Sequence, residues 1–344
     1  MDINLVYDSD RGVYLLNGTR VLLLPRGALE LIQDTVNIVL GLATKTILED
    51  AMRTTVYSFL TDMVNLKMLK RRGEDKMLNE IFEFFRDIGF GKFDVVSTEL
   101  NYYTVGSDRN FNSALSMVKP MNYCYQAYGM LEAIFKVAGR KNTKVDETRC
   151  KTSGSADMDT FGVTVTDSRE EYQYIASQPY PTEDSKVERV ELMETESGPI
   201  VNSEPVEIVP VIFFPYLFSK LRSIIGMGAY GIQRNMGASL SKLYSQTSLK
   251  EIAAKYQVSG FYVLPRLAGT GRIDLVKNSI GGLEEIDIYD SFNALHADSL
   301  SEKRCFLLSG LLSGLSYPLT GISIKLHETE CSAVNNSVCK FSFE

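Results

Sequence analysis

The sequence predicts an α+β protein made of two tandem copies of one unit, in which helices pack on an antiparallel sheet. The first observation is a repeat at a spacing of 181 residues, which relates Cys124 to Cys305 (305 − 124), Glu147 to Glu328 (328 − 147) and Cys150 to Cys331 (331 − 150). In each half, predicted strands come first, predicted helices follow and strands then return. Strands and helices therefore do not alternate strictly, which favours an antiparallel sheet. The length of 344 residues leaves room for two domains of ordinary size.

Each copy is expected to open with short strands and to continue with helices. Runs of Val, Leu and Ile bounded by Gly and Asp predict strands within 5–25 and 191–210, and both segments end on a proline. Apolar residues at steps of three and four then predict helices. These helices are expected at 27–41, 43–64 and 74–88 in the first copy and at 215–246 and 248–257 in the second.

The second half of each copy carries the cysteines. Strands are predicted at 91–105 and 272–289, a helix bearing the first cysteine at 121–138 and 302–316, and a closing hairpin at 143–166 and 321–343. The predicted domains are therefore residues 1–166 and 187–344. Residues 167–186 between them are acidic, contain prolines and have few large aliphatic side chains, which is typical of a linker. The three tyrosines of this linker favour a path along the protein surface.

Composition excludes several classes of protein. A net charge of −7 and a pI near 5.2 argue against a nucleic-acid-binding surface, which needs a basic face. The N-terminus has neither the basic nor the apolar region of a secretory signal. The most apolar stretches, 209–218 and 305–316, are respectively too short and too rich in Ser and Gly to span a membrane. Five cysteines are an odd number for a disulfide framework, so the sequence favours metal ligands and a reducing cytoplasm.

The strongest motif is a set of three cysteines and a glutamate near the C-terminus. Cys305, Glu328, Cys331 and Cys339 follow the pattern C-x22-E-x2-C-x7-C. Three thiolates and a carboxylate suit four-coordinate Zn²⁺, and four protein ligands leave no position for substrate, which indicates structural zinc. The alternative is that these cysteines are small buried hydrophobic residues without a metal.

The first copy is predicted to hold a degenerate form of the same site. Cys124, Glu147 and Cys150 are present, but the constant spacing places Met158 where Cys339 lies in the second copy (339 − 181 = 158). A thioether is a poor zinc ligand, so no zinc is expected there. A redox pair of Cys124 and Cys150 is the alternative interpretation.

These motifs resemble those of a known family. Cys305 at a helix rich in Gly and Ser, Glu328-x-x-Cys331, and Cys339-Lys-Phe341 together look like the vinyl-reductase-type, hydrocarbon-binding domain. That family is related to the sensor domains of phenol- and xylene-responsive transcriptional activators and to TRAPP small subunits, in a fold group that includes NO-signalling ligand-binding domains. The resemblance covers most of 187–344 and the first copy more loosely. In the aromatic sensors a Cys, Glu, Cys, Cys set binds structural zinc, and it matches the four residues of the second copy.

The resemblance implies a binding module with an apolar pocket between helices and sheet, often dimeric. We therefore expect non-enzymatic binding or sensing of a hydrophobic or aromatic small molecule, with a protein partner supplying the output and a homodimer as one arrangement. The aromatic sensors carry an ATPase and a DNA-binding helix pair after this domain, and no such output domain is expected within 1–344. Aromatic residues of the second copy are candidates for the pocket, or for plain core: Phe213, Phe214, Tyr216, Phe218, Tyr230, Phe261 and Tyr262.

Two other functions remain open from the sequence. The chain could be a scaffold or assembly subunit that uses the fold as an interaction surface. It could also be a reductase acting on a tetrapyrrole-like substrate, although it has only two histidines and no Walker A or dinucleotide fingerprint.

Overall fold

The computed structural model describes most of the chain. The described residues are 3–70, 73–113, 115, 124–139, 142–153, 156–167, 171–176, 186–195, 198–247, 249, 261–277, 283–294, 305–335 and 338–343. The helix expected at 248–257 lies outside them apart from Leu249, as do 302–304 and most of the second half of the expected linker.

The first copy follows the predicted order of elements. Its strands and helices are β1 (Leu5–Asp8), β2 (Val13–Leu16), β3 (Thr19–Pro25), α1 (Ala28–Leu40), α2 (Ala43–Asn65), α3 (Glu74–Asp87), β4 (Gly91–Glu99), β5 (Tyr102–Asn110), α4 (Tyr125–Val137), β6 (Thr143–Arg149) and β7 (Asp159–Val165). The expected strand region 91–105 is a hairpin that turns at Asn101, whose positive φ of 61° suits a tight turn.

The second copy repeats this order. Its elements are β8 (Val187–Arg189), β9 (Met193–Thr195), β10 (Gly198–Val201), β11 (Glu204–Pro210), α5 (Phe213–Ile225), α6 (Gly228–Tyr244), α8 (Leu264–Ala268), β12 (Arg272–Lys277), β13 (Leu283–Tyr289), α9 (Phe306–Thr320), β14 (Leu326–Glu330), α10 (Ser332–Asn335) and β15 (Val338–Phe343). The prediction of one helix over 215–246 is wrong, because Gly226 ends α5 at φ 57°. The chain then starts α6, as Gly41 separates α1 from α2 in the first copy.

The two copies are joined by one sheet. Its seven strands run in the order β8-β1-β2-β3-β11-β10-β9, so β3 of the first copy pairs antiparallel with β11 of the second. Leu23 lies opposite Ile208, and Val21 and Pro25 lie opposite Pro210 and Val206. The two strands are equivalent seven-residue segments that both end on a proline, and each proline lies two residues from the Leu23–Ile208 pair, which places the local twofold at that pair. The α+β prediction with two copies is therefore confirmed, with the copies arranged as a dimer within one chain.

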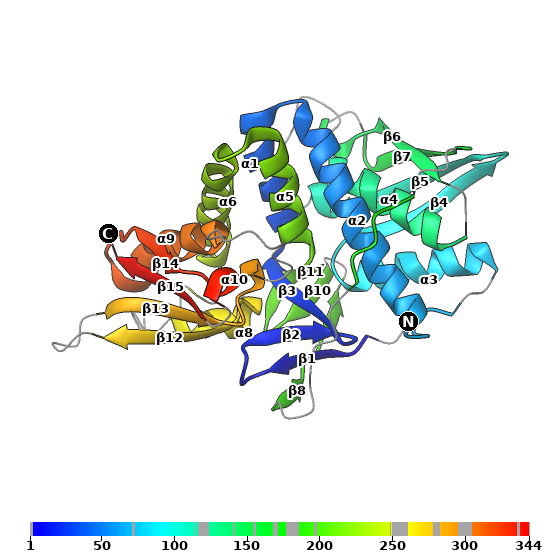
Figure 1. Cartoon of the computed structure of the whole chain (residues 1–344). Helices are drawn as coiled ribbons and strands as arrows, with labels where there is room; N and C mark the ends of the chain where they lie inside the picture. Colours follow the sequence, from blue (N-terminus) through cyan, green and yellow to red (C-terminus); the bar gives the residue numbers. More distant parts are fainter. Residues whose placement is uncertain are drawn as a thin grey trace.

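Each copy also carries a four-stranded antiparallel sheet of the same order, β4-β5-β7-β6 and β12-β13-β15-β14. Figure 1 shows these sheets on opposite flanks of the central helices, with the seven-stranded sheet below the helices. A continuous apolar core fills the space between these layers. Among the described residues, no helix combines the length and the apolar character needed to cross a bilayer.

Close helix pairs bring the cysteine-bearing helices into place. In the second copy a Cβ on Gly310 of α9 would lie 2.0 Å from the carbonyl oxygen of Arg234 in α6. In the first copy a Cβ on Gly129 of α4 would lie 1.9 Å from the carbonyl oxygen of Glu49 in α2. Glycine at these equivalent positions (310 − 129 = 181) lets the backbones of the paired helices touch.

The described part of the linker lies on the surface of the helices. Tyr174 donates a hydrogen bond to Asp62 (2.5 Å), and the amide of Ile175 donates to Ser58 Oγ (3.0 Å). Tyr172 packs edge-on against Tyr57 at 5.5 Å between ring centroids. The expected surface path is therefore confirmed for two of the three tyrosines, and Tyr180 lies outside the described residues.

Candidate metal centres

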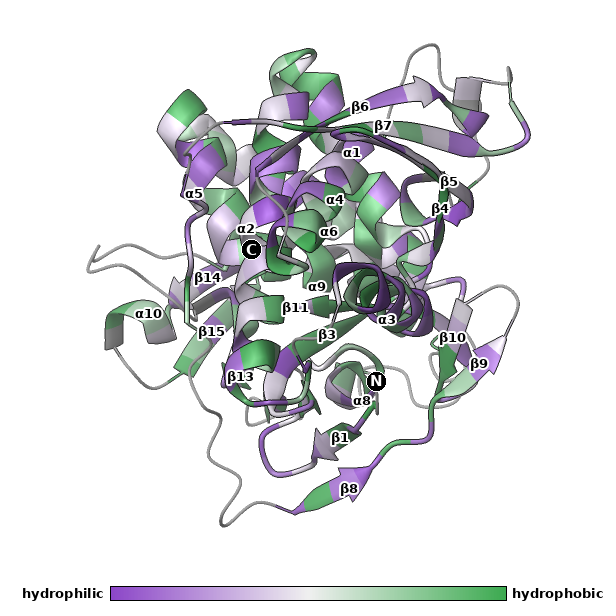
Figure 2. Cartoon of the chain, turned by 90° about the vertical axis from the view of Figure 1, so that its right-hand side faces the viewer, coloured by the Kyte–Doolittle hydropathy of each residue, from purple (hydrophilic) through white to green (hydrophobic). Residues whose placement is uncertain are grey.

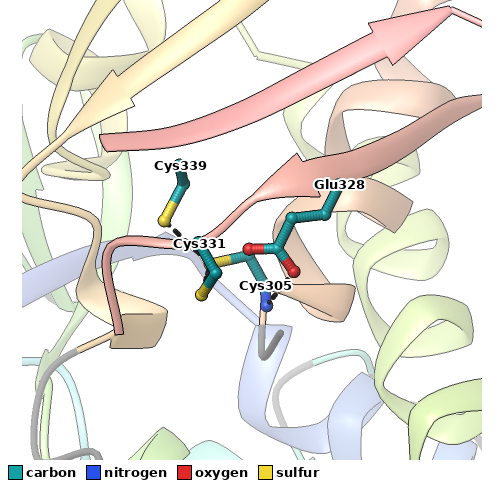
Figure 3. Close-up of side chains that lie close together, drawn as sticks. All are labelled: Cys305, Glu328, Cys331 and Cys339. Carbon is teal, nitrogen blue, oxygen red and sulfur yellow. Dashed lines mark hydrogen bonds between the residues drawn. The ribbon is translucent and has the colours of Figure 1, made fainter. Parts of the chain in front are cut away.

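The four predicted ligands of the second copy converge on one point (Figure 3). Cys305 immediately precedes α9, Glu328 lies on β14, Cys331 follows that strand, and Cys339 lies on β15. Their ligand atoms all lie within 4.8 Å of one another, and all four residues are buried. The Sγ of Cys305 is 3.2 Å from that of Cys339 and 3.9 Å from that of Cys331.

Local backbone structure explains this convergence. The β14–β15 pairing is irregular between Glu328 and Glu330, and α10 turns the chain back so that the amide of Val334 donates to the carbonyl of Cys331 (2.9 Å). The backbone amide of Cys305 donates to Glu328 Oε2 at 3.0 Å, which ties the helix start to the hairpin. The amide and hydroxyl of Ser332 contact Cys339 Sγ at 3.3 and 3.1 Å.

Electrostatics of the second-copy cluster favour a cation. Burial, with the neighbouring Cys331, raises the pKa of Glu328 to about 8, and burial raises the pKa of the Cys305 thiol well above its usual value. Hydrogen bonds from the thiols of Cys305 and Cys331 and from Ser332 lower the pKa of Cys339 to about 4. Cys339 therefore carries a negative charge at neutral pH, and a cation in the site would also favour loss of the protons from Glu328 and Cys305.

The donor set fits zinc. Zn²⁺ accepts Cys sulfur and carboxylate oxygen in a tetrahedron, and two sulfurs each about 2.3 Å from the metal are then about 3.8 Å apart. The Cys305–Cys331 separation of 3.9 Å agrees with that spacing, and the Cys305–Cys339 separation of 3.2 Å is shorter. Four protein donors would close the coordination shell.

A second cluster lies at the equivalent place of the first copy. Cys124, Glu147 and Cys150 come together as the sequence predicts, and the fourth member is Asp159. The ligand atoms again lie within 4.8 Å of one another, and all four residues are buried. Both clusters could hold a metal ion.

The assignment of Met158 to the fourth position is therefore wrong. Met158 is 37% exposed and its side chain lies over Gly106, whereas Asp159 is fully buried. In the closing hairpins Glu147 pairs with Phe161 as Glu328 pairs with Phe341, so Asp159 is the equivalent of Cys339. The turn is one residue longer in the first copy, with nine positions from Cys150 to Asp159 (159 − 150) and eight from Cys331 to Cys339 (339 − 331).

The first-copy cluster differs in its surroundings. The amide of Cys124 lies 3.4 Å from Glu147 Oε2, a longer contact than its counterpart, and Tyr128 donates to the same oxygen at 3.3 Å. Ser309 of the second copy stands at the position of Tyr128 (309 − 128 = 181) and instead donates to the carbonyl of Leu326 at 2.6 Å. Burial, with Cys150 nearby, raises the pKa of Glu147 to about 8, and burial raises that of Cys124 well above its usual value.

Aromatic residues of the second copy that were candidates for a pocket mostly pack in the core. Phe213, Phe214 and Phe261 are almost fully buried, and Tyr230 stacks on Phe306 at 4.2 Å. A cleft of about 290 Å³ lies instead in the first copy, between α2, α3 and the end of α4. Its lining residues are Tyr57, Thr61, Val64, Asn65, Glu74, Met77, Lys136, Val137, Ala138 and Gly139. This cleft has no signal in the sequence beyond the three helices that form it.

Comparison with known proteins gives structural matches only. No protein-family model and no curated protein matches this chain. The chain is similar to TRAPP subunit 3 of Naegleria fowleri covalently bound to palmitic acid, with a TM-score of 0.33 and 13% identity, over 42% of this chain and 98% of that chain. It is also similar to the phenol-responsive sensory domain of the transcription activator PoxR with phenol, with a TM-score of 0.31 and 18% identity, over 45% of this chain and 83% of that chain.

Proposed function

We propose that this chain is a non-enzymatic binding protein for a hydrophobic small molecule, and that structural zinc holds its second copy together. The observation that carries the zinc assignment is the buried set of three thiols and a carboxylate between the start of α9 and the closing hairpin. A metal there would add to the hydrogen bonds by which Ser309 and Ser313 of α9 already hold the backbone of Leu326 in the hairpin. With all four positions taken by protein side chains, the metal supplies cohesion rather than an open site for reaction.

The cleft of the first copy supports binding of a small molecule. Its volume of about 290 Å³ lies near the lower end of ligand-binding sites and suits a single aromatic ring. Apolar side chains such as Val64 and Met77 line it together with polar and charged groups such as Glu74 and Lys136. Small-molecule sites likewise combine apolar side chains with polar groups that orient the ligand.

The linker gives this cleft a route to the second copy. Tyr172 packs on Tyr57, a residue of the cleft, and the Lys136 ammonium lies 5.5 Å from the Tyr172 ring centre. The next residue, Gln173, accepts a hydrogen bond from Tyr216 of α5 at 3.0 Å. A ligand that moves Tyr57 would therefore shift a segment that touches both copies, as a sensor requires.

Native mass spectrometry of the freshly purified full chain tests the zinc and any retained ligand together. Binding of added toluene and phenol is then followed by saturation-transfer NMR. We expect Thr61→Trp, which fills the cleft from α2, to abolish probe binding. Thr46→Trp on the exposed face of the same helix is the matched control and should bind as the wild type does. A folded wild-type chain that retains no ligand and binds neither probe would contradict small-molecule binding.

A scaffold function is favoured by one specific observation. The α1–α2 and α5–α6 turns lie at equivalent places at the same end of the molecule, away from the central sheet (Figures 1 and 2). Both expose large apolar side chains, with Ile38 84%, Leu42 80% and Met227 74% exposed. If affinity purification of the chain returns one stoichiometric partner that Leu42→Asp releases, the assembly function gains the stronger support.

A further inference from the structure

We propose that the first copy also holds a metal ion, bound by Cys124, Glu147, Cys150 and Asp159 as a site of two sulfur and two oxygen donors. This site is separate from the zinc centre of the second copy and does not depend on it. The proposal stands on the equivalence of backbone geometry, on the burial of the donors and on their chemistry.

Backbone geometry at the first-copy cluster reproduces that of the second copy. Cys124 precedes α4 with φ −85° and ψ 48°, and Cys305 precedes α9 with φ −85° and ψ 35°. In both copies the amide of that cysteine faces the glutamate, at 3.4 Å for Glu147 and 3.0 Å for Glu328. The pairing irregularity after the glutamate also recurs in both closing hairpins.

The turn that carries the fourth donor is equivalent as well. The amide of Lys151 donates to Asp159 Oδ1 at 2.6 Å, just as the amide of Ser332 donates to Cys339 Sγ at 3.3 Å. Lys151 and Ser332 each follow the second cysteine of their copy directly. A carboxylate that only capped this turn would need no neighbouring thiols, yet Asp159 also lies within 4.8 Å of the other three donors.

Burial makes this grouping costly without a cation. Asp159 is fully buried, Cys124 is fully buried, and Cys150 and Glu147 are 1% and 7% exposed. Two carboxyls and two thiols crowded away from water repel one another when ionised, and a divalent ion offsets both the repulsion and the lost hydration. With a divalent ion bound and all four donors ionised, the net charge of the site would be 2 − 4 = −2, the same as in the second copy.

The donors indicate which ions would bind. Zn²⁺ accepts both cysteine sulfur and carboxylate oxygen, so it suits both copies. Replacing one thiolate by a carboxylate makes the first site harder and less selective for thiophilic metals. We therefore expect the first copy to bind Zn²⁺ more weakly than the second and to lose it first to a chelator.

Zinc counting on the full chain tests this inference. The purified protein is loaded with Zn²⁺, and native mass spectrometry follows the ion count during an EDTA titration. We expect two ions in the wild type, lost in two separate steps, and the earlier step to be missing in Asp159→Asn. The side-chain oxygen of asparagine can still accept the hydrogen bond from the backbone amide of Lys151, but asparagine has no carboxylate to bind a metal. Met158→Leu, one residue away and outside the cluster, is the matched control and should keep both steps.

Further variants separate this inference from the structural zinc of the second copy. Cys150→Ser should also remove only the earlier step, and Cys339→Ser only the later one, with circular dichroism checking that each variant is folded. A wild type with one ion that Cys339→Ser removes and Asp159→Asn does not would overturn the first-copy site and leave the second-copy zinc standing. A single ion removed by Asp159→Asn alone would support the first-copy site and overturn the zinc of the second. A folded wild type that takes up no Zn²⁺ would overturn both.

Discussion

Each copy places four potential metal ligands on an equivalent backbone arrangement, but the two copies differ in the fourth donor. The second copy has Cys339 where the first has Asp159, and Ser309 where the first has Tyr128. The helix start and the irregular strand pairing recur in both copies, and the turn after the second cysteine begins with the same type of backbone hydrogen bond but is one residue longer in the first copy. Backbone contacts therefore set the positions of the four side chains, and one donor can be replaced by another without loss of the cluster.

The largest expected difference between the copies concerns their cysteines. Cys331→Ser should lower stability by about 4 kcal/mol if free zinc exceeds the dissociation constant about a thousandfold, because the metal binds only the folded state. That loss corresponds to roughly 10 °C in Tm for a unit of this size. Cys150→Ser should cost less, because we expect the first copy to hold its ion more weakly. Differential scanning calorimetry measures both.

The control for this comparison is excess chelator, under which the stability gap between Cys331→Ser and the wild type should shrink strongly. Equal losses for Cys331→Ser and Cys150→Ser in zinc would mean that the two copies do not differ in metal affinity.

The helix contacts should behave alike in the two copies. Gly310→Ala and Gly129→Ala each force a Cβ against a carbonyl oxygen of the neighbouring helix, so each should cost about 2–3 kcal/mol. Gly231→Ala is the matched control, since no heavy atom lies within 4 Å of its added Cβ, and it should stabilise α6 by up to about 1 kcal/mol. Urea denaturation tests all three, and a neutral Gly129→Ala would break the equivalence of α4 and α9.

A smaller effect is expected at Glu207, where the copies differ. This buried carboxyl accepts hydrogen bonds from the amides of Gly27 (2.7 Å) and Leu29 (3.0 Å) at the start of α1. Glu207→Gln can accept only one of them and should cost about 1–2 kcal/mol. Burial raises the pKa of Glu207 from its ordinary value of 4.5 to about 8. Between these two pH values the carboxyl holds a proton in the folded protein that it has released in the unfolded protein.

The sign of the pH dependence follows from that raised pKa. The contribution of the Glu207 proton to stability is complete below the unfolded pKa near 4.5 and is lost as pH rises through about 8. The destabilisation by Glu207→Gln should therefore be largest near pH 5 and shrink toward pH 8, measured by urea denaturation across that range. Exposed Glu194→Gln is the control and should give a small, constant difference. A gap between Glu207→Gln and the wild type that grows with pH would show that the carboxylate is the stabilising form.

Periodicity and spacing predict most elements and seven of the eight cluster residues. The helices expected at 27–41, 43–64 and 74–88 match α1, α2 and α3 within a residue or two. The apolar residues of α3 lie on one buried face, whereas α2 is buried on several sides. The break at Gly226 is harder to predict, since apolar residues continue on both sides of it.

Asp159 escaped prediction because a constant spacing cannot allow for one extra residue in a turn. The signal that could have found it is the aromatic residue two positions later. Asp159-Thr-Phe161 matches Cys339-Lys-Phe341, and both phenylalanines are fully buried. A buried aromatic in the return strand fixes the register more firmly than a count of residues does.

Fusion into one chain frees the copies from symmetry. In a homodimer any interface mutation appears twice, so a glutamate beside the twofold axis would bring a second buried carboxyl with it. Here Glu207 lies opposite Leu24, and the position related to it by the local twofold is Leu22, which lies opposite Val209. One copy can thus acquire a charge, a helix cap or a pocket at the β3–β11 interface while the other copy keeps its packing. A duplicated gene encoding this chain can specialise its halves separately, while the halves stay together at any dilution.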